Sequence, residues 1–133
     1  MMNSKEIEWE MSKYEDANYN SRQLEEIYLG FESGIDVSKY ADLELDFDCP
    51  RFNGEQMKQI RLGLESKVVI SKYADPKFDE DQMYVIREGL ESGIDVSKYA
   101  DPKFSVEEME EIAEMLFSEK EERERVKEPK MEI

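Results

Sequence analysis

Carboxylates are the side chains of this sequence that could do chemistry, because Asp and Glu number 34 against 18 Lys and Arg. One group lies in a segment of strictly alternating acidic and apolar residues that ends at Cys49. Successive side chains of an extended chain point to opposite faces, so this segment would present its carboxylates together. Its acidic residues are Asp42, Glu44, Asp46 and Asp48, and the apolar residues between and after them are Leu43, Leu45, Phe47 and Cys49.

Three interpretations fit this acidic segment: a surface loop whose apolar side covers the core, a partner-binding edge, or a calcium loop. Loops carry binding residues more often than the elements they join. The spacing of the acids is similar to that of calcium ligands, but the sixth position is not glycine and the twelfth is Asn53 rather than Glu. We therefore expect no metal ion and no other cofactor. The calcium loop is the least favoured of the three interpretations, and all three stay open.

A second group of carboxylates lies between Phe104 and Ser118, where the sequence contains no Lys or Arg. Acids in the first turn of a helix suit its dipole, and a solvated helix face explains many such runs. The absence of compensating lysines at i,i+4 positions of this helix gives some support to a functional role for its negative surface. From this group we take four residues as partner-binding candidates beside those of the acidic segment: Glu107, Glu110, Glu111 and Glu114.

The composition excludes the commonest enzymes. Histidine is missing, Cys49 is the one cysteine, and the sequence contains no glycine-rich phosphate loop, so we expect no catalytic residue. A net charge of -16 repels nucleic acids and anionic membranes and attracts basic proteins. Neither a signal sequence nor an apolar run of membrane-spanning length occurs, and a reduced, cytoplasmic setting fits best.

The elements that position these carboxylates follow from an internal repeat. Residues 32–42 recur letter for letter at 91–101, and a third copy with four changes occupies 65–75. Such repetition is the signature of repeat proteins. The tyrosines that anchor the alignment are Tyr14, Tyr40, Tyr73 and Tyr99. They are separated by 26, 33 and 26 residues, and the seven extra residues of the long step are Leu43–Cys49.

Each repeat carries the same helix-start signal, an N-cap residue followed three positions later by Gln or Glu, which predicts a capping box. The pairs are Asn20/Gln23, Asn53/Gln56, Asp79/Gln82 and Ser105/Glu108. Apolar residues at helical spacing follow, and Gly34 and Gly93 suit the left-handed end of a helix. We predict an all-α fold: a solenoid-like stack of four 26-residue α-helical repeat units, with the seven-residue insertion and capping N- and C-terminal helices. The expected single domain spans 1–133, with a cap (1–13), four units (14–39, 40–72, 73–98 and 99–117) and a charged extension (118–133) that is helical to about Val126.

Three further columns of the alignment predict details of packing. Glycines inside the helices indicate a close approach of the neighbouring unit's backbone; they are Gly30, Gly63 and Gly89. The tyrosines that close the turns are expected to bury their rings and leave their hydroxyls in water. Lys67 replaces the glycine that ends the other helices, so we expect the packing to deviate after the second unit.

The segments QMYVIREGLESGIDVSKYADPKF (82–104) and QMKQIRLGLES (56–66) resemble a repeat of the form QMxxIRxGLExGxDVSxYADPxF. Tandem copies of it occur in proteins of gut bacteria, their phages and mobile elements, and the resemblance covers residue 14 to about residue 117. It implies no catalytic residues. The phage context implies a counter-defence role, such as that of anti-CRISPR or anti-restriction proteins that occupy the nucleic-acid groove of their target.

The charge density agrees with that role. Four units at about 8 to 10 Å per helix layer span roughly 40 Å, so the net charge amounts to about one per 2.5 Å, against about one per 1.7 Å of duplex DNA. We therefore expect a non-enzymatic acidic protein of the bacterial host cytoplasm that mimics nucleic acid and inhibits a basic partner, such as a nuclease or another nucleic-acid-binding effector. We expect no direct contact with nucleic acid or membrane. The alternative is a protein-interaction scaffold that binds through exposed apolar residues such as Trp9, Tyr28 or Phe47.

Overall fold

A computed structural model describes residues 2–41 and 52–127, and in this part of the chain every regular element is helical. The prediction of an all-α fold is therefore confirmed. The α-helices are α1 (Ser4–Glu15), α2 (Ser21–Ser33), α3 (Gly54–Glu65), α4 (Glu80–Ser92) and α5 (Val106–Lys127). Three short 3-10 turns follow α2, α3 and α4: η1 (Val37–Lys39), η2 (Ile70–Lys72) and η3 (Val96–Lys98).

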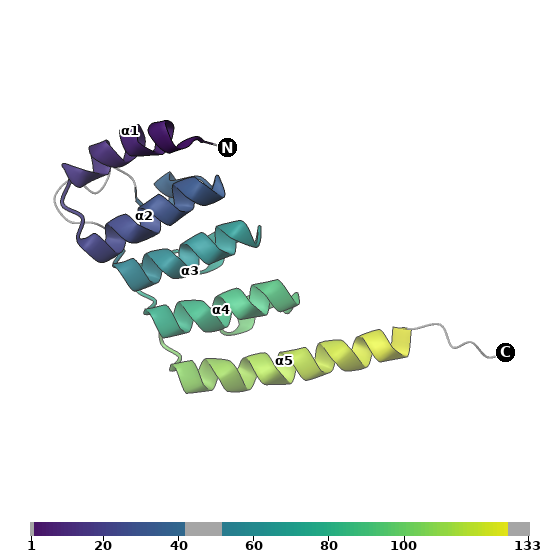
Figure 1. Ribbon diagram of the computed structural model, residues 1–133. Helices are drawn as coiled ribbons and strands as arrows, with labels where there is room; N and C mark the ends of the chain where they lie inside the picture. The colour runs from purple at the N-terminus through teal and green to yellow at the C-terminus, as the bar shows by residue number, and fades with distance from the viewer. Residues whose placement is uncertain (1, 42–51, 128–133) are drawn as a thin grey trace.

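The helices lie side by side in chain order, and each contacts the next (Figure 1). Helices α2 to α5 run in the same direction, whereas α1 runs the opposite way. Helix α5 is the longest and extends past the end of α4 (Figure 1). We call the contact between two successive helices a joint, and the three joints from α2 to α5 position the residues of interest.

The helices begin where the capping boxes predicted. At α2, the Asn20 side chain accepts a hydrogen bond from the Gln23 N–H at 2.8 Å, and Gln23 Oε1 accepts one from the Asn20 N–H at 2.7 Å. The same pair of bonds starts α3, α4 and α5. A further box that we did not predict, formed by Asn3 and Glu6, starts α1. Local sequence alone therefore fixes where these helices begin.

The capping glutamines have a second role that links one helix to the next segment. While its oxygen caps its own helix, the amide nitrogen of Gln23 donates to the backbone carbonyl of Phe52 at 2.8 Å. Gln56 and Gln82 donate to the carbonyls of Phe78 and Phe104, both at 2.7 Å. A carboxylate could not donate in this way. The last capping residue, Glu108, is a carboxylate on α5, the last helix of the chain.

The tyrosines that close the three turns are buried, but their hydroxyls are not in water as we had expected. The hydroxyls donate to carbonyls inside the preceding helix: Tyr40 to Glu26 at 2.7 Å, Tyr73 to Gln59 at 2.6 Å and Tyr99 to Val85 at 3.3 Å. Burial raises the pKa of all three phenols, that of Tyr99 to about 12. Each turn is thereby tied to its own helix.

These hydroxyls also explain the glycines inside the helices, so the expected contact with a neighbouring unit's backbone is wrong. A Cβ atom added at Gly63 would lie 2.0 Å from the hydroxyl oxygen of Tyr73, and Gly30 and Gly89 face their own tyrosines in the same way. No side chain fits there. Helix α5 carries Met115 in this column, and no 3-10 turn with a tyrosine follows it among the described residues.

The expected deviation in packing after the second unit stays a prediction. Val69 makes no side-chain cap bond of the kind that Asp36 and Asp95 make in the other turns. The backbone of the turn after α3 nevertheless matches the other two, although Lys67 replaces glycine. This lysine adopts φ 62, close to the values of 75 and 80 at Gly34 and Gly93. The backbone bonds that close the helix are also the same, with the N–H groups of residues 67 and 68 donating to Leu64 and Gly63. The backbone geometry of the turn is therefore the same, although Lys67 must adopt the left-handed conformation, which is unfavourable for a residue with a side chain.

Candidate protein-binding site

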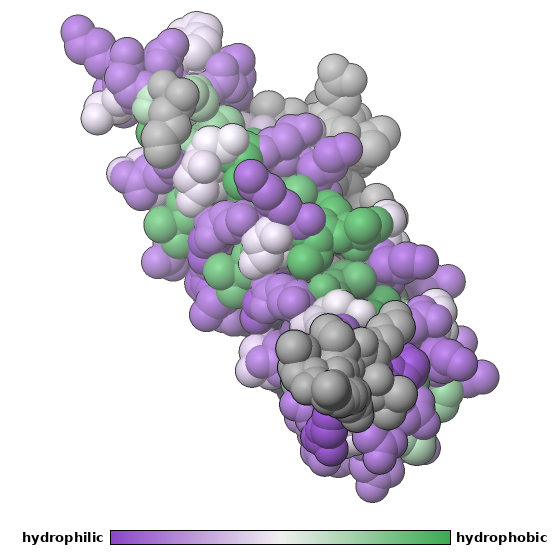
Figure 2. All heavy atoms as spheres, turned by 90° about the vertical axis from the view of Figure 1, so that its right-hand side faces the viewer, coloured by the Kyte–Doolittle hydropathy of each residue, from purple (hydrophilic) through white to green (hydrophobic). Residues whose placement is uncertain are grey.

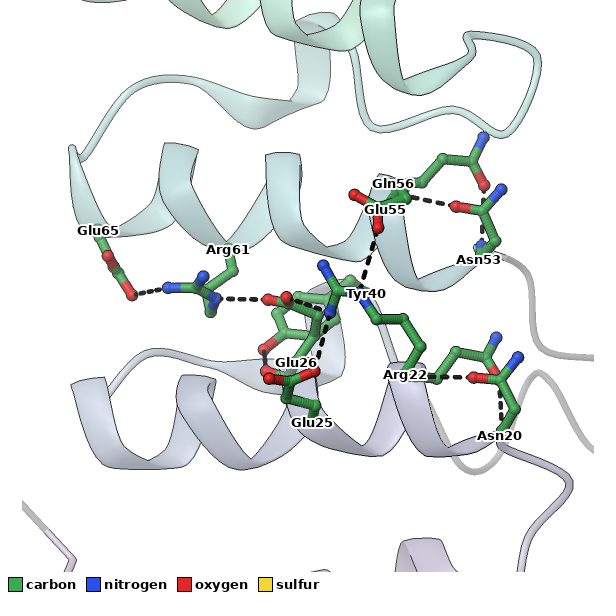
Figure 3. A network of polar contacts seen from close by, with 11 residues as sticks. Asn20, Arg22, Glu25, Glu26, Tyr40, Asn53, Glu55, Gln56, Arg61 and Glu65 are labelled. Atoms are coloured by element: carbon green, nitrogen blue, oxygen red, sulfur yellow. Dashed lines mark hydrogen bonds and ion pairs between the residues drawn. The ribbon is translucent and has the colours of Figure 1, made fainter.

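At the joint between α2 and α3, a buried carboxylate binds arginines of both helices. Glu26 is 2% exposed, and both of its oxygens are bound by arginines. Arg61 of α3 donates through Nε to Glu26 Oε1 at 2.7 Å, while Arg22 of α2 binds the other oxygen and also reaches Glu55 of α3 at 3.2 Å (Figure 3). A carboxylate without such partners would not be buried here.

The outer edge of the same joint is closed by a second acid. Arg61 extends past Glu26 and donates to Glu65 at 2.7 Å, and the Ser33 hydroxyl donates to the same Glu65 oxygen at 2.7 Å. The Arg61 side chain is 12% exposed as a result. Arg61 therefore links an acid of α2 to an acid of its own helix.

The joint between α3 and α4 repeats this arrangement with one change. Arg87 occupies the position of Arg61 and donates to Glu91 at 2.7 Å, an acid that also accepts a hydrogen bond from the Ser66 hydroxyl at 2.8 Å. Its Nε donates to Gln59 at 3.0 Å, so a neutral amide stands where the first joint has Glu26. This joint is sealed with one carboxylate fewer.

The joint between α4 and α5 is open. The three positions that held the acceptor, the arginine and the outer acid are now Val85, Ala113 and Phe117. Between the helices lies a groove of about 460 Å³, which we call the α4–α5 groove. Its lining consists of an apolar part (Val85, Gly89, Ile94, Ala113 and Phe117) and a polar part (Glu88, Ser92, Glu110, Glu114 and Ser118).

Two of the predicted site residues, Glu110 and Glu114, lie in this groove, and Glu88 of α4 joins them from the other side. The predicted residues Glu107 and Glu111 lie on the same helix but do not line the groove. All four predicted acids of α5 are exposed. Among residues 2–41 and 52–127, no lysine or arginine forms a salt bridge with any of them. Their charge therefore faces solvent without internal compensation.

The other four predicted residues, Asp42, Glu44, Asp46 and Asp48, lie outside the described residues, as does the whole of Leu43–Cys49. Within the described part, no three His, Cys, Asp or Glu side chains are grouped so that they could hold a metal ion. None of the described helices combines the length and the apolar character needed to cross a bilayer.

No family model, curated protein or solved structure matches this chain. What the protein binds must therefore follow from its own residues.

Our reading of the sequence missed the groove, although a signal for it was present. In the alignment, Gln59-Ile60-Arg61 and Val85-Ile86-Arg87 correspond to Glu111-Ile112-Ala113. A long cationic side chain is thus replaced by the smallest apolar one at a single column. The sequence analysis grouped the carboxylates of α5 on one helix. That Glu88 of α4 lies beside them is visible only in the folded structure.

Proposed function

We propose that this protein is a non-enzymatic, acidic helical-repeat protein that binds a basic partner and inhibits it. The partner class that fits is a nuclease or another nucleic-acid-binding effector, whose cationic groove the protein occupies as a nucleic acid would. The role is a counter-defence one, anti-CRISPR-like, in the cytoplasm of a bacterial host. The scaffold for this role is a single domain of four stacked helical units, with the seven-residue insertion and terminal caps.

The observation that carries this proposal is the contrast between internal and outward carboxylates. At the α2–α3 and α3–α4 joints, arginines bind the acids Glu26, Glu65 and Glu91. On α5, none of the four exposed acids forms a salt bridge with another described residue. Uncompensated charge on a rigid helix creates a local negative potential that attracts a basic surface and accelerates its association.

A cleavage assay tests the proposal. Bacterial defence nucleases, CRISPR effectors among them, are incubated with the protein, and cleavage of duplex DNA is measured at about 50 mM and about 200 mM salt. Inhibition is expected at low salt and should weaken as salt rises, because the binding is electrostatic. The variant in which Glu107, Glu110, Glu111 and Glu114 are changed to Lys should lose inhibition while its melting temperature stays unchanged.

A matched control lies farther along the same helix. Changing Glu119, Glu121, Glu122 and Glu124 to Lys alters the net charge by the same amount without touching the predicted site. Equal loss of inhibition in both variants would show that only the overall charge matters and would reject the site. A protein that inhibits none of these nucleases at either salt concentration would contradict the proposed function.

A second candidate function rests on apolar surface. Figure 2 faces the end of the molecule at which α2, α3 and α4 finish, and it shows a band of hydrophobic residues between hydrophilic ones. Val69, in the turn after α3, is 59% exposed, and Trp9 on α1 is 66% exposed. A scaffold that binds a peptide through such residues would bind equally well at low and high salt, and it would lose affinity on Trp9→Ala or Val69→Asp.

A further inference from the structure

The α4–α5 groove is open enough to admit a side chain of a partner. Its apolar part is formed by Val85 and Ile94 from the α4 side and by Ala113 and Phe117 of α5. Val85 is 5% exposed, so it forms a closed floor, whereas Phe117 is 41% exposed and lies at the edge. The groove can therefore hold a narrow side chain with a long apolar stem.

The other two joints show which side chain suits this position. In both of them an arginine from the second helix of the pair fills the space, Arg61 beside Glu26 and Arg87 beside Gln59. Their guanidinium groups bind a polar side chain of the preceding helix and an outer acid of their own helix. At the third joint Ala113 supplies no such side chain.

The charges at the groove point to a cation. Glu88, Glu110 and Glu114 approach it from both helices, and no salt bridge among the described residues involves any of them. The only hydrogen bond to this trio among those residues comes from the Tyr84 hydroxyl, which donates to Glu88 at 2.7 Å. Three acids around an apolar floor complement a side chain that is apolar along its stem and positive at its tip.

We infer that the α4–α5 groove receives an arginine side chain of the basic protein partner, in the place that Arg61 and Arg87 occupy at the other joints. This inference rests on the proposed function and names the contact through which the partner is held. Arginine fits better than lysine because its planar group can stack on the Phe117 ring and bind two carboxylates at once.

The test uses the full chain, labelled with nitrogen-15, and two probes: an acetylated, amidated peptide Gly-Arg-Gly-Arg-Gly and its lysine counterpart. NMR titration should move the amide signals of Val85, Gly89 and Ala113 more than those of α1. The arginine peptide should bind more tightly than the lysine peptide by about threefold, the factor that an exposed cation–π contact contributes.

Ala113→Arg is the decisive variant, because it places the chain's own arginine in the groove. It should weaken binding of the arginine peptide by at least about tenfold, as expected when a charge-assisted hydrogen bond is lost. Met115→Arg is its matched control: the charge change is the same, and Met115 is exposed and does not line the groove. The control should stay within about twofold of the wild type, as a single screened charge predicts.

A pair of double variants covers the possibility that Ala113→Arg disturbs folding. Glu110→Gln with Glu114→Gln should weaken peptide binding, and Glu119→Gln with Glu122→Gln on the same helix should not. Equal losses in both pairs, or an unchanged affinity in a folded Ala113→Arg protein, would overturn the groove inference. If the groove inference fails in this way, salt-dependent inhibition of a nuclease would still support the proposed function. A wild-type protein that binds no basic protein would refute both the inference and the proposed function.

Discussion

The α2–α3 and α4–α5 joints use the same three positions for opposite purposes. At the first, Arg61 is held between Glu26 and Glu65 and the joint is closed. At the last, Ala113 leaves an open groove with carboxylates around it. The α3–α4 joint is intermediate, since Gln59 replaces the buried acid there. The side chains therefore differ from joint to joint along the stack. At the α4–α5 joint, no salt bridge among the described residues involves Glu88, Glu110 or Glu114.

The largest effect should come from breaking the closed joint. Glu26→Ala removes the acceptor of two arginines and leaves Arg61, whose side chain is 12% exposed, with Glu65 as its remaining acidic partner among the described residues. The cost should be about 3 kcal/mol of the free energy of unfolding. Urea denaturation followed by circular dichroism measures it.

The control for this variant comes from the neighbouring joint. Glu26→Gln installs the residue type that already serves Arg87 at the α3–α4 joint, so it should cost only about 1 kcal/mol. A similar loss for both substitutions would mean that the closed joint needs the charge itself, and the proposed equivalence of the joints would fail.

The next largest effect should come from the contact between a 3-10 turn and the helix that precedes it. Both kinds of joint contain this contact. Gly63→Ala would force a Cβ atom to within 2.0 Å of the Tyr73 hydroxyl oxygen, which should cost about 2 kcal/mol through overpacking. Met115→Ala at the same column of α5 should change stability by less than about 0.5 kcal/mol. Thermal denaturation of the two variants gives the comparison.

A double variant distinguishes this contact from a general intolerance of alanine at residue 63. Tyr73→Phe removes the hydroxyl and leaves the ring carbon 3.2 Å from the added Cβ. The combination with Gly63→Ala should therefore cost less than the sum of the two single changes, by about 1 kcal/mol or more. Strict additivity would contradict the explanation given for the helix glycines.

A third substitution compares the capping residues of the two helices that form the α4–α5 joint. Gln82→Glu keeps the cap on α4 but loses the amide that donates to the carbonyl of Phe104 at 2.7 Å, at a cost of about 1.5 kcal/mol. Glu108→Gln on α5 is the matched reverse change and should be neutral. If Gln82→Glu is also neutral, the glutamine amides do not hold successive segments together.

Much of this fold follows from the sequence because its signals are local. The capping boxes, the helical spacing and the left-handed glycines each depend on residues within a few positions of one another. Those patterns located α2 to α5 and the end of α5 near Val126 correctly. Of the candidate site, the sequence identified Glu110 and Glu114, but only as acids of one helix.

The remainder depends on contacts between distant residues. Glu26 and Arg61 are 35 residues apart in the sequence, and nothing local tells a buried acid from the exposed ones around it. The same holds for Glu88, which reaches the groove from a different helix than Glu110. The helix glycines were misinterpreted for a related reason: the tyrosine hydroxyl that excludes a side chain lies in the turn that folds back on the helix.

The smallest effect should come from the turn after α3, the one of the three 3-10 turns η1 to η3 whose preceding helix ends without glycine. Lys67 holds φ 62, in the region that costs a residue with a side chain about 1 to 2 kcal/mol, while glycine loses more conformational freedom on folding. Lys67→Gly should therefore raise the free energy of unfolding by about 0.5 kcal/mol net. Gly93→Lys, the reverse exchange at the end of α4, should lower it, since Gly93 adopts φ 80 in an equivalent turn. A loss of stability in Lys67→Gly would show that the lysine side chain contributes more than its backbone strain costs. In that case the turn after α3, like the α4–α5 joint, would be a place where the sequence departs from the repeat for a reason other than folding.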